Sequence, residues 1–330
     1  MKNIILDCDG AADDILALLL ILSSPEELRL LGVTTVDGSV SVQQAARNVN
    51  ATLTKAGRSG VPVHMGASGP LKGEDKGNDD AYGEDGLNGV IWSNVWMPRE
   101  EGADEFLIRK LEEVNSAITL VATGPLTNIA RLFAARPDLI DGKVEELVIM
   151  GGSLGVHDPH TGKTRHGNMT PHAEFNAHKD APAFAQVLNM AERINLKTTV
   201  FTMSGIQGRN QATKPGVVIT PERQEMLAEI SPDLAKIAMT PAWLDMGKFG
   251  AKGAFSFDPN TVLYLLHPNL YDIKDEQTFS VSTGGERAGR TYIGDKAGSS
   301  IRVLKSVKNP EAVVQHMATH FRTVFAHKPL

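Results

Sequence analysis

The chain has 330 residues, of which 42% are hydrophobic and 22% charged, as in an ordinary globular protein with ample core. Its net charge of −6 offers no polycationic surface, so we expect neither nucleic acid nor an anionic membrane as a partner. The single cysteine, Cys8, excludes an internal disulfide framework and is typical of a reducing compartment. Met1 leads directly into the first predicted strand and no long apolar run follows, so we expect no signal peptide, no membrane span and a cytoplasmic protein.

The first half of the chain alternates predicted strands with predicted helices. Apolar runs predict strands over residues 3–6, 28–36, 61–64, 117–122 and 144–150. Helical patterns occupy 15–22, 42–56, 103–115 and 126–135. The stretch 66–100 is irregular, and a segment this long without regular structure is usually functional.

The second half begins with another irregular stretch, 153–176, and then resumes the alternation. A helix over 181–191 and a strand over 193–201 come first, and two helices broken near Ser231-Pro232 lie within 221–247. A helix over 261–266, antiparallel strands over 271–303 and a final helix over 310–325 complete the pattern. We therefore predict one α/β domain over 1–330, with a Rossmann-like, mainly parallel sheet, helices on both faces and a small antiparallel addition near the C-terminus.

Four carboxylates crowd the turn between the first strand and the first helix, at Asp7, Asp9, Asp13 and Asp14. In open α/β sheets ligands bind where such turns leave the strands. A helix dipole stabilises each carboxylate by only about 0.3–1 kcal/mol, whereas two carboxylates about 4 Å apart repel by roughly 4 kcal/mol at an effective dielectric near 20. Either some of these groups are protonated, or a hard cation such as Ca²⁺ or Mg²⁺ lies among them. The alternative is that Asp13 and Asp14 only cap the helix while Asp7 and Asp9 face solvent.

Two further motifs follow predicted strands. The turn Thr123-Gly124-Pro125-Leu126-Thr127-Asn128 is tight enough to aim the Thr123 carbonyl into a crevice, although a plain strand–helix turn would read the same way. The segment 168–176 (NMTPHAEFN) offers Asn168, Glu174 and Asn176 as hydrogen-bonding partners. Two amides and a carboxylate suit a polyol better than a phosphate, which would require Arg or Lys. A simply solvated loop is the alternative.

The segment DCDGAADD resembles the DxDxxxDD signature of the nucleoside N-ribohydrolases, the inosine-uridine preferring nucleoside hydrolase family. The turn ATGPLTN and the segment NMTPHAEFN are similar to that family's TG-x-L-T/S-N turn and ribose clamp, and Met150-Gly-Gly and Asp258-Pro259 match its later motifs. The resemblance spans residues 1 to about 262 in the family's order. It implies a Ca²⁺-dependent homodimer or homotetramer that hydrolyses the N-glycosidic bond of ribonucleosides to ribose and free base.

The resemblance also implies a role for each matching residue. The calcium ligands would be Asp9, Asp14, the Thr123 carbonyl and Asp258. Asp9 would also take a proton from a calcium-bound water, which is chemically reasonable for a carboxylate within hydrogen-bond reach. The ribose would lie on Met150, with its 2′-hydroxyl on Asp13, its 5′-hydroxyl on Asn168 and Glu174, and its 3′-hydroxyl on Asn176.

Two departures from the family concern the leaving base. Phe257 stands where many members carry a histidine that protonates the base, and Tyr82 stands in place of a second family histidine. Gly10, Asp37 and Phe257 instead match the purine-specific branch. We therefore predict purine preference, with Asp37 touching the base edge and a stack formed by Phe257 with one of three residues, Tyr82, Trp92 or Trp96.

The competing prediction is that a histidine of the 153–176 stretch, His166 or His172, swings in as the acid and readmits pyrimidines. With His157 and His160 these residues are also a candidate metal site. Their spacing fits no zinc pattern, so a solvated lid is the favoured interpretation.

Two other classes of function compete with hydrolysis. A haloacid dehalogenase-type phosphatase would use Asp7-Cys8-Asp9-Gly10 as its nucleophile motif and Gly294-Asp295 as its late acidic motif. It would leave Asp13, Asp14 and AEFN unexplained. A non-catalytic nucleoside- or sugar-binding protein on the same fold would lose the water-activating Asp9, which this chain retains.

Overall fold

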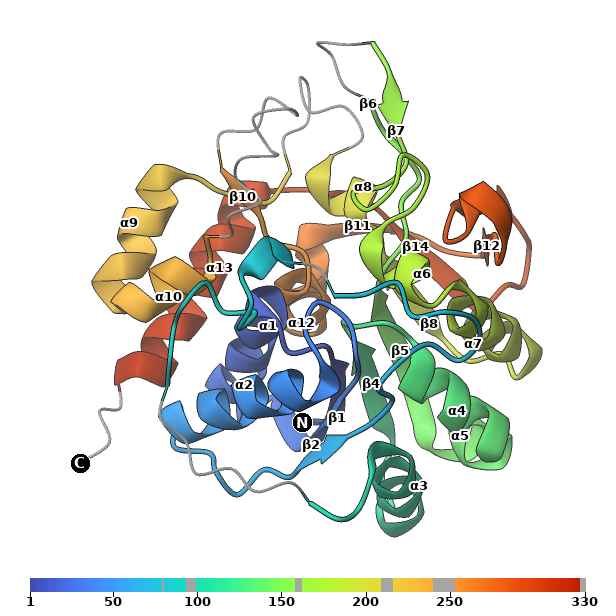
Figure 1. Cartoon of the computed structure of the whole chain (residues 1–330), viewed down its shortest axis with the longest axis horizontal. Coiled ribbons are helices and arrows are strands. Elements are labelled where there is room, and N and C mark those ends of the chain that lie inside the picture. The colour runs from blue at the N-terminus through green and yellow to red at the C-terminus, as the bar shows by residue number, and fades with distance from the viewer. Residues whose placement is uncertain (79, 93–98, 158–161, 209–215, 240–252, 327–330) are drawn as a thin grey trace.

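The centre of the protein is an eight-stranded sheet, seen in a computed structural model that describes residues 1–78, 80–92, 99–157, 162–208, 216–239 and 253–326 (Figure 1). The strand order is β11-β14-β8-β5-β4-β1-β2-β3. The strands are β1 (Lys2–Cys8), β2 (Leu28–Thr35), β3 (Val63–Met65), β4 (Ile118–Ala122), β5 (Val144–Met150), β8 (Thr198–Phe201), β11 (Tyr271–Lys274) and β14 (Ile301–Val307). All neighbouring pairs are parallel except β11 and β14, which confirms the predicted sheet.

Both faces of the sheet are buried, because successive side chains of a strand point to opposite faces. In β1, Ile4 and Leu6 belong to one hydrophobic cluster and Ile5 to another. In β5, Val148 belongs to the first of these clusters and Ile149 to the second. A sheet covered on both sides explains why these strands read as continuous apolar runs.

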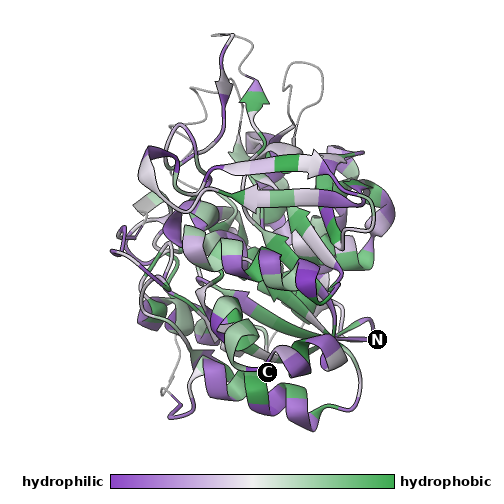
Figure 2. Cartoon of the chain, turned by 90° about the vertical axis from the view of Figure 1, so that its right-hand side faces the viewer, coloured by the Kyte–Doolittle hydropathy of each residue, from purple (hydrophilic) through white to green (hydrophobic). Residues whose placement is uncertain are grey.

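Helices cover the two faces as two layers (Figure 1). One layer holds α1 (Ala12–Ser23), α2 (Val42–Lys55), α12 (Pro259–Leu266) and α13 (Pro310–Ala326), with α9 (Pro221–Ile230) and α10 (Pro232–Ile237) beyond them. The other holds α3 (Ala103–Glu113), α4 (Thr127–Ala135), α5 (Pro137–Lys143) and α7 (Ala181–Arg193). Figure 2 shows the strands mostly hydrophobic and the helices with hydrophilic stretches along their length, as amphipathic helices on a core require.

Short elements complete the fold. They are η1 (Asp80–Tyr82), α6 (Phe175–Lys179), α8 (Met203–Gln207), η3 (Pro268–Leu270), η4 (Gly285–Arg287) and the two-stranded sheets β6 (Val156–His157) with β7 (Thr164–Arg165), β9 (Val218–Ile219) with β10 (Ala254–Phe255), and β12 (Gln277–Val281) with β13 (Thr291–Asp295). The β6–β7 hairpin projects away from the sheet at the top of Figure 1.

The structure differs from the predicted elements in several places. The strand predicted over 193–201 begins only at Thr198, because α7 continues to Arg193 and Asn195 adopts a left-handed turn with φ of 54°. The tail predicted as antiparallel is mixed, since β14 pairs in parallel with β8. The helices α5, α6 and α8 were not predicted, because five to seven residues are too few to display a helical period.

Among the described helices, none combines the length and the apolar character that crossing a bilayer requires.

Candidate active site

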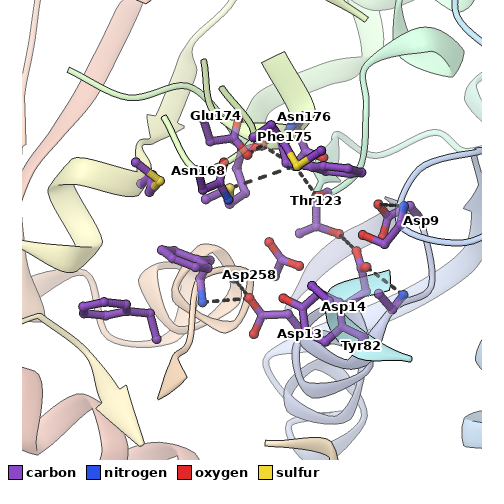
Figure 3. Close-up of a pocket in the computed structure, with 18 of the residues that line it drawn as sticks. Asp9, Asp13, Asp14, Tyr82, Thr123, Asn168, Glu174, Phe175, Asn176 and Asp258 are labelled. Carbon is purple, nitrogen blue, oxygen red and sulfur yellow. Dashed lines mark hydrogen bonds between the residues drawn. The ribbon is translucent and has the colours of Figure 1, made fainter. Parts of the chain in front are cut away.

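A pocket lies where three neighbouring strands of the sheet, β1, β4 and β5, reach their carboxyl ends (Figure 3). Its volume of about 220 Å³ is below the roughly 300–1,000 Å³ of drug-sized ligand sites, so it suits a small molecule. The residues predicted for the site that line it are Asp9, Asp13, Asp14, Tyr82, Thr123, Met150, Asn168, Glu174, Asn176, Phe257 and Asp258. Figure 3 shows Asn168, Glu174 and Asn176 on one side and Asp13, Asp14 and Asp258 on the other.

The turn after β1 delivers three aspartates to the pocket. Gly10 has φ of 68°, and a Cβ there would lie 2.5 Å from the Ala45 Cα, so the turn requires glycine. The helix α1 then begins at Ala12, which places Asp13 and Asp14 in its first turn. Asp14 accepts hydrogen bonds from the Ala11 N–H (3.0 Å) and the Thr123 hydroxyl (2.5 Å), so it caps the helix as well as facing the pocket.

Asp9 and Asp13, the other two aspartates of this turn, also accept hydrogen bonds from backbone N–H groups. Asp9 accepts a hydrogen bond from the Ser39 N–H at 2.8 Å. Asp13 accepts from the N–H groups of Phe257 and Asp258, at 2.8 and 3.1 Å, which ties the start of α1 to the start of α12. Asp9, Asp13 and Asp258 are each at most 7% exposed.

Asp7 lies outside the pocket. Its carboxylate accepts from the Thr34 hydroxyl (2.6 Å) and the Asn128 amide (2.7 Å), and burial raises its pKa to about 7. The alternative in which Asp7 and Asp9 face solvent is wrong, because both are buried. The phosphatase interpretation is also wrong. Its nucleophile Asp7 does not line the pocket, and Asp295 lies on the β12–β13 hairpin in an ion pair with Lys274.

Burial gives the pocket carboxyls unusual proton affinities. Burial, and then the charge of Asp9, raise the pKa of Asp14 well above its usual range. Burial, and then the charge of Asp13, do the same to the pKa of Asp258. Burial raises the pKa of Asp13 to about 6. Burial and neighbouring carboxylates raise all three pKa values, which agrees with the crowding of carboxylates described from the sequence.

The pocket carboxylates and the Thr123 carbonyl offer only oxygen atoms as metal ligands, and oxygen ligands fit a hard cation. Within the described part of the chain, no three His, Cys, Asp or Glu side chains already form a group that could hold a metal ion. The carboxylates instead accept from nearby N–H and hydroxyl groups.

The opposite side of the pocket is built around the short helix α6. Glu174 caps this helix and accepts three backbone hydrogen bonds, from Gly152 (2.7 Å), Asn176 (2.9 Å) and Ala177 (3.1 Å). Burial raises the pKa of Glu174. The Asn176 amide donates to the carbonyls of Thr123 (2.7 Å) and Met150 (3.1 Å), and its own buried carbonyl oxygen has no hydrogen-bond partner among the described residues. An unpaired buried acceptor facing a pocket is suited to a ligand hydroxyl.

Aromatic side chains form the remaining wall. Tyr82 and Phe257 both line the pocket, and the Phe255 ring lies 6.0 Å from that of Phe257. Trp92 does not line it, because its indole N–H donates to Asp233 at 2.8 Å and its ring packs against the core. Trp96 lies outside the described residues. Of the two predicted stacking partners that the structure describes, Tyr82 therefore lines the pocket together with Phe257 and Trp92 does not.

Asp37 is not where the sequence argument expected it. Its carboxylate pairs with Lys179 at 2.8 Å, and both side chains are buried outside the pocket lining. Ser39, two residues further along the same turn, reaches the pocket instead. The prediction failed because an unforeseen lysine, distant in sequence, draws the carboxylate away.

The histidines predicted as alternative acids also lie outside the pocket lining. Arg290 approaches both of them, with one nitrogen 3.4 Å from His172 Nδ1 and another 3.2 Å from His166 Nε2. Burial, and then the charge of Arg290, lower the pKa of His166, which disfavours a proton on this ring, and the nearby Arg290 charge would also repel a metal cation. His157 is exposed on β6, and His160 lies outside the described residues.

Sequence reasoning missed several residues that line the pocket, among them Ser39, Arg165, Met203 and Gln207. Arg165 is the only basic side chain among the described lining residues. It comes from β7, a two-residue strand that leaves no period-2 signal. The position of Arg165 three residues before Asn168 was the one available clue.

Comparison with known proteins gives a consistent result. A family model described as "Inosine-uridine preferring nucleoside hydrolase" matches residues 4–316. A pyrimidine-specific ribonucleoside hydrolase RihA of Shewanella sp. (strain ANA-3) is 36% identical over 280 residues, covering 83% of this chain and 80% of the relative. The RihA of Shewanella woodyi is 34% identical over 304 residues, covering 90% and 89%.

Solved structures share the fold. The plant nucleoside hydrolase PpNRh1 superposes with a TM-score of 0.82 at 25% identity, covering 97% of this chain and 98% of that one. A purine-preferring ribonucleoside hydrolase from Gardnerella vaginalis superposes with a TM-score of 0.80 at 23% identity, with 98% of each chain covered, which supports the fold alone.

Proposed function

The chain belongs to the inosine-uridine preferring nucleoside hydrolase family, and from that premise we propose how its pocket hydrolyses the N-glycosidic bond of ribonucleosides. One observation carries the proposal. Buried carboxylates face the buried hydrogen-bonding groups of Glu174 and Asn176 across one small pocket, which lies at the carboxyl ends of adjacent strands. Water attack at C1′ of the ribose requires an acceptor for the water proton and a fixed sugar, and these two sides would supply them.

Asp9 is the proposed general base. The Ser39 N–H holds one oxygen of its carboxylate at 2.8 Å, which leaves the other oxygen to accept a proton from the attacking water. As the oxygen of that water bonds to C1′, the bond between C1′ and the base nitrogen breaks. The electron pair of that bond leaves with the base.

Calcium is the proposed cofactor, with Asp9, Asp14, Asp258 and the Thr123 carbonyl as its ligands. The raised pKa values of Asp14 and Asp258 support this proposal, since a buried cation would offset their charge. When bound, calcium would supply a lowered pKa for water and a neutralised pocket.

The ribose would be held by groups on both sides of the pocket. We assign the 2′-hydroxyl to Asp13, the 3′-hydroxyl to Asn176, whose unpaired carbonyl oxygen is a ready acceptor, and the 5′-hydroxyl to Glu174 and Asn168. Met150 would lie beneath the sugar.

The preferred base is the finer part of the proposal. Tyr82 and Phe257 offer flat rings between which a purine would stack, and a stacked purine has several nitrogens that can take a proton from solvent. Pyrimidine specificity is the second candidate. The RihA relatives named above carry that name, and the Arg165 charge at the pocket would stabilise the negative charge of a departing uracil.

A panel of inosine, guanosine, adenosine, uridine and cytidine tests these proposals together. Each nucleoside is assayed for released base with the native protein, after chelation, and after calcium is restored. Purine preference predicts a higher kcat/KM for inosine than for uridine, and the calcium proposal predicts loss on chelation and recovery on calcium addition. Size-exclusion chromatography of the same preparation tests the predicted homodimer or homotetramer.

A further inference from the structure

A buried lysine lies just behind the pocket. Lys179 is the last residue of α6, and its side chain is 3% exposed. Its ammonium group donates to the Asp75 carboxylate at 2.8 Å and to the Gly77 carbonyl at 2.5 Å, and it forms an ion pair with the Asp37 carboxylate, also at 2.8 Å. The Asp37 side chain is only 7% exposed, which makes this a buried ion pair.

The turn that carries Asp37 also holds Asp9. The Ser39 N–H donates to the Asp9 carboxylate at 2.8 Å. A Cβ on Gly38 would lie 2.2 Å from an Asp9 carboxylate oxygen, so the backbone at Gly38 packs directly against that side chain. Asn78 donates to the Gly38 carbonyl at 2.8 Å and fixes the turn from outside. The direction of the Asp9 carboxylate therefore depends on where the 37–39 turn lies.

The helix that ends at Lys179 begins at the sugar side of the pocket. Glu174 is its N-cap, and Asn176 in its first turn donates to the carbonyls of Thr123 and Met150. The helix has five residues and is therefore only about 7.5 Å long. One short, rigid element thus carries the sugar-binding groups at one end and the lysine at the other.

We propose that the Lys179–Asp37 ion pair sets the spacing between Asp9 and the sugar-binding pair Glu174 and Asn176. Lys179 does not line the pocket, so it acts as a positioning residue. A buried ion pair is a weak source of stability, because desolvation offsets its Coulomb energy, whereas displacement of reacting groups by about 1 Å costs about 100-fold in rate. The inference rests on the proposed function, which supplies the roles of Asp9 and Glu174.

The first test replaces Lys179→Met. The hydroxyl-binding groups stay on α6, so substrate binding is retained while their alignment with Asp9 is lost. We expect kcat to fall about 10–100-fold, as for other residues that orient a reacting group, with KM changing less than about threefold. The matched control is Lys76→Met. Lys76 contacts the same helix through the His178 carbonyl and not through Asp37, and we expect both constants to stay within about twofold of wild type.

The second test uses Asp37→Ala, alone and combined with Lys179→Met. Both changes break the same link, so the double variant should lose no more kcat than Lys179→Met alone. Losses that multiply, a loss confined to KM, or an equal loss in Lys76→Met would overturn the proposal. If Lys179→Met does not fold, wild-type kcat in Asp37→Ala would overturn it. Failure of the wild type to hydrolyse any ribonucleoside would instead refute the proposed function.

Discussion

Glu174 has two roles in this account, sugar binding and helix capping. Glu174→Ala, measured on substrates with and without the 5′-hydroxyl, separates them. A carboxylate offers about four lone-pair positions. In this protein three are taken by backbone N–H groups, those of Gly152, Asn176 and Ala177. One position remains, and we propose that the substrate's 5′-hydroxyl donates to it. Glu174→Ala would remove both that bond and the cap.

The two losses have different consequences. A hydrogen bond to a charged group contributes about 1.5–3 kcal/mol, which corresponds to about 10–150-fold in kcat/KM. Loss of a helix cap costs about 0.5–2 kcal/mol of stability and affects every substrate alike. The ratio of kcat/KM for inosine to that for 5′-deoxyinosine therefore isolates the hydroxyl contact. We expect a ratio of about 10–150 in the wild type. In Glu174→Ala the ratio should be much lower, because only the proposed contact with Asn168 remains.

The matched control is Ser41→Ala, which removes the cap of α2 away from the pocket. This variant should lose stability in thermal unfolding and keep the wild-type ratio. Equal losses on inosine and 5′-deoxyinosine in Glu174→Ala would show that Glu174 only caps α6 and does not contact the 5′-hydroxyl.

Three further predictions follow from the pocket and from a histidine cluster outside it. Asp9→Ala should lower kcat at least about 100-fold and weaken calcium binding in calorimetry, and full activity of the metal-free variant would contradict the mechanism. Phe257→Ala should reduce kcat/KM for inosine more than for uridine. If the wild type instead cleaves uridine as fast as inosine, and activity is lost in His172→Ala but not in Phe257→Ala, the acid is the histidine of the loop. Burial, and then the charge of neighbouring histidines, lower the pKa values of His267 and His320. In the unfolded chain these histidines regain the ordinary pKa of about 6.5, so near and below that pH the unfolded state binds more protons than the folded state. The buried carboxyls Asp7 and Asp13 act in the opposite direction, so the test is the difference between variants. As the pH drops from 7.5 to 5.5, His320→Gln should gain thermal stability relative to the wild type; an unchanged difference would contradict this.

The first turn of the site was predictable from sequence because its signals are local. A buried strand followed at once by a buried helix placed Asp9, Asp13 and Asp14 at one sheet edge, and the structure brings all three to the pocket. Asp7 was grouped with these residues in the sequence, but it does not line the pocket. The alternation of side chains along a strand already indicated a difference. Asp7 shares its side of β1 with Ile5, whose side chain packs against the opposite layer from Ile4 and Leu6.

The partners of Asp37 and the origin of Arg165 were not predictable in this way. Asp37 and Lys179 lie far apart in the sequence, and only the docking of α6 beside the β2 end brings them together. Arg165 lies on a two-residue strand, too short for any periodic signal. Long-range pairing and short hairpins are the features that local patterns do not encode.

The most direct test of N-glycosidic hydrolysis at this pocket is an analysis of the reaction products in phosphate-free buffer. Purified protein with calcium is incubated with inosine and with uridine, and base and sugar are quantified by chromatography and proton NMR. Hydrolysis at this pocket predicts free base and ribose in equal amounts from at least one of the two, and none from Asp9→Ala. Intact nucleosides after prolonged incubation, or equal release by Asp9→Ala, would contradict it.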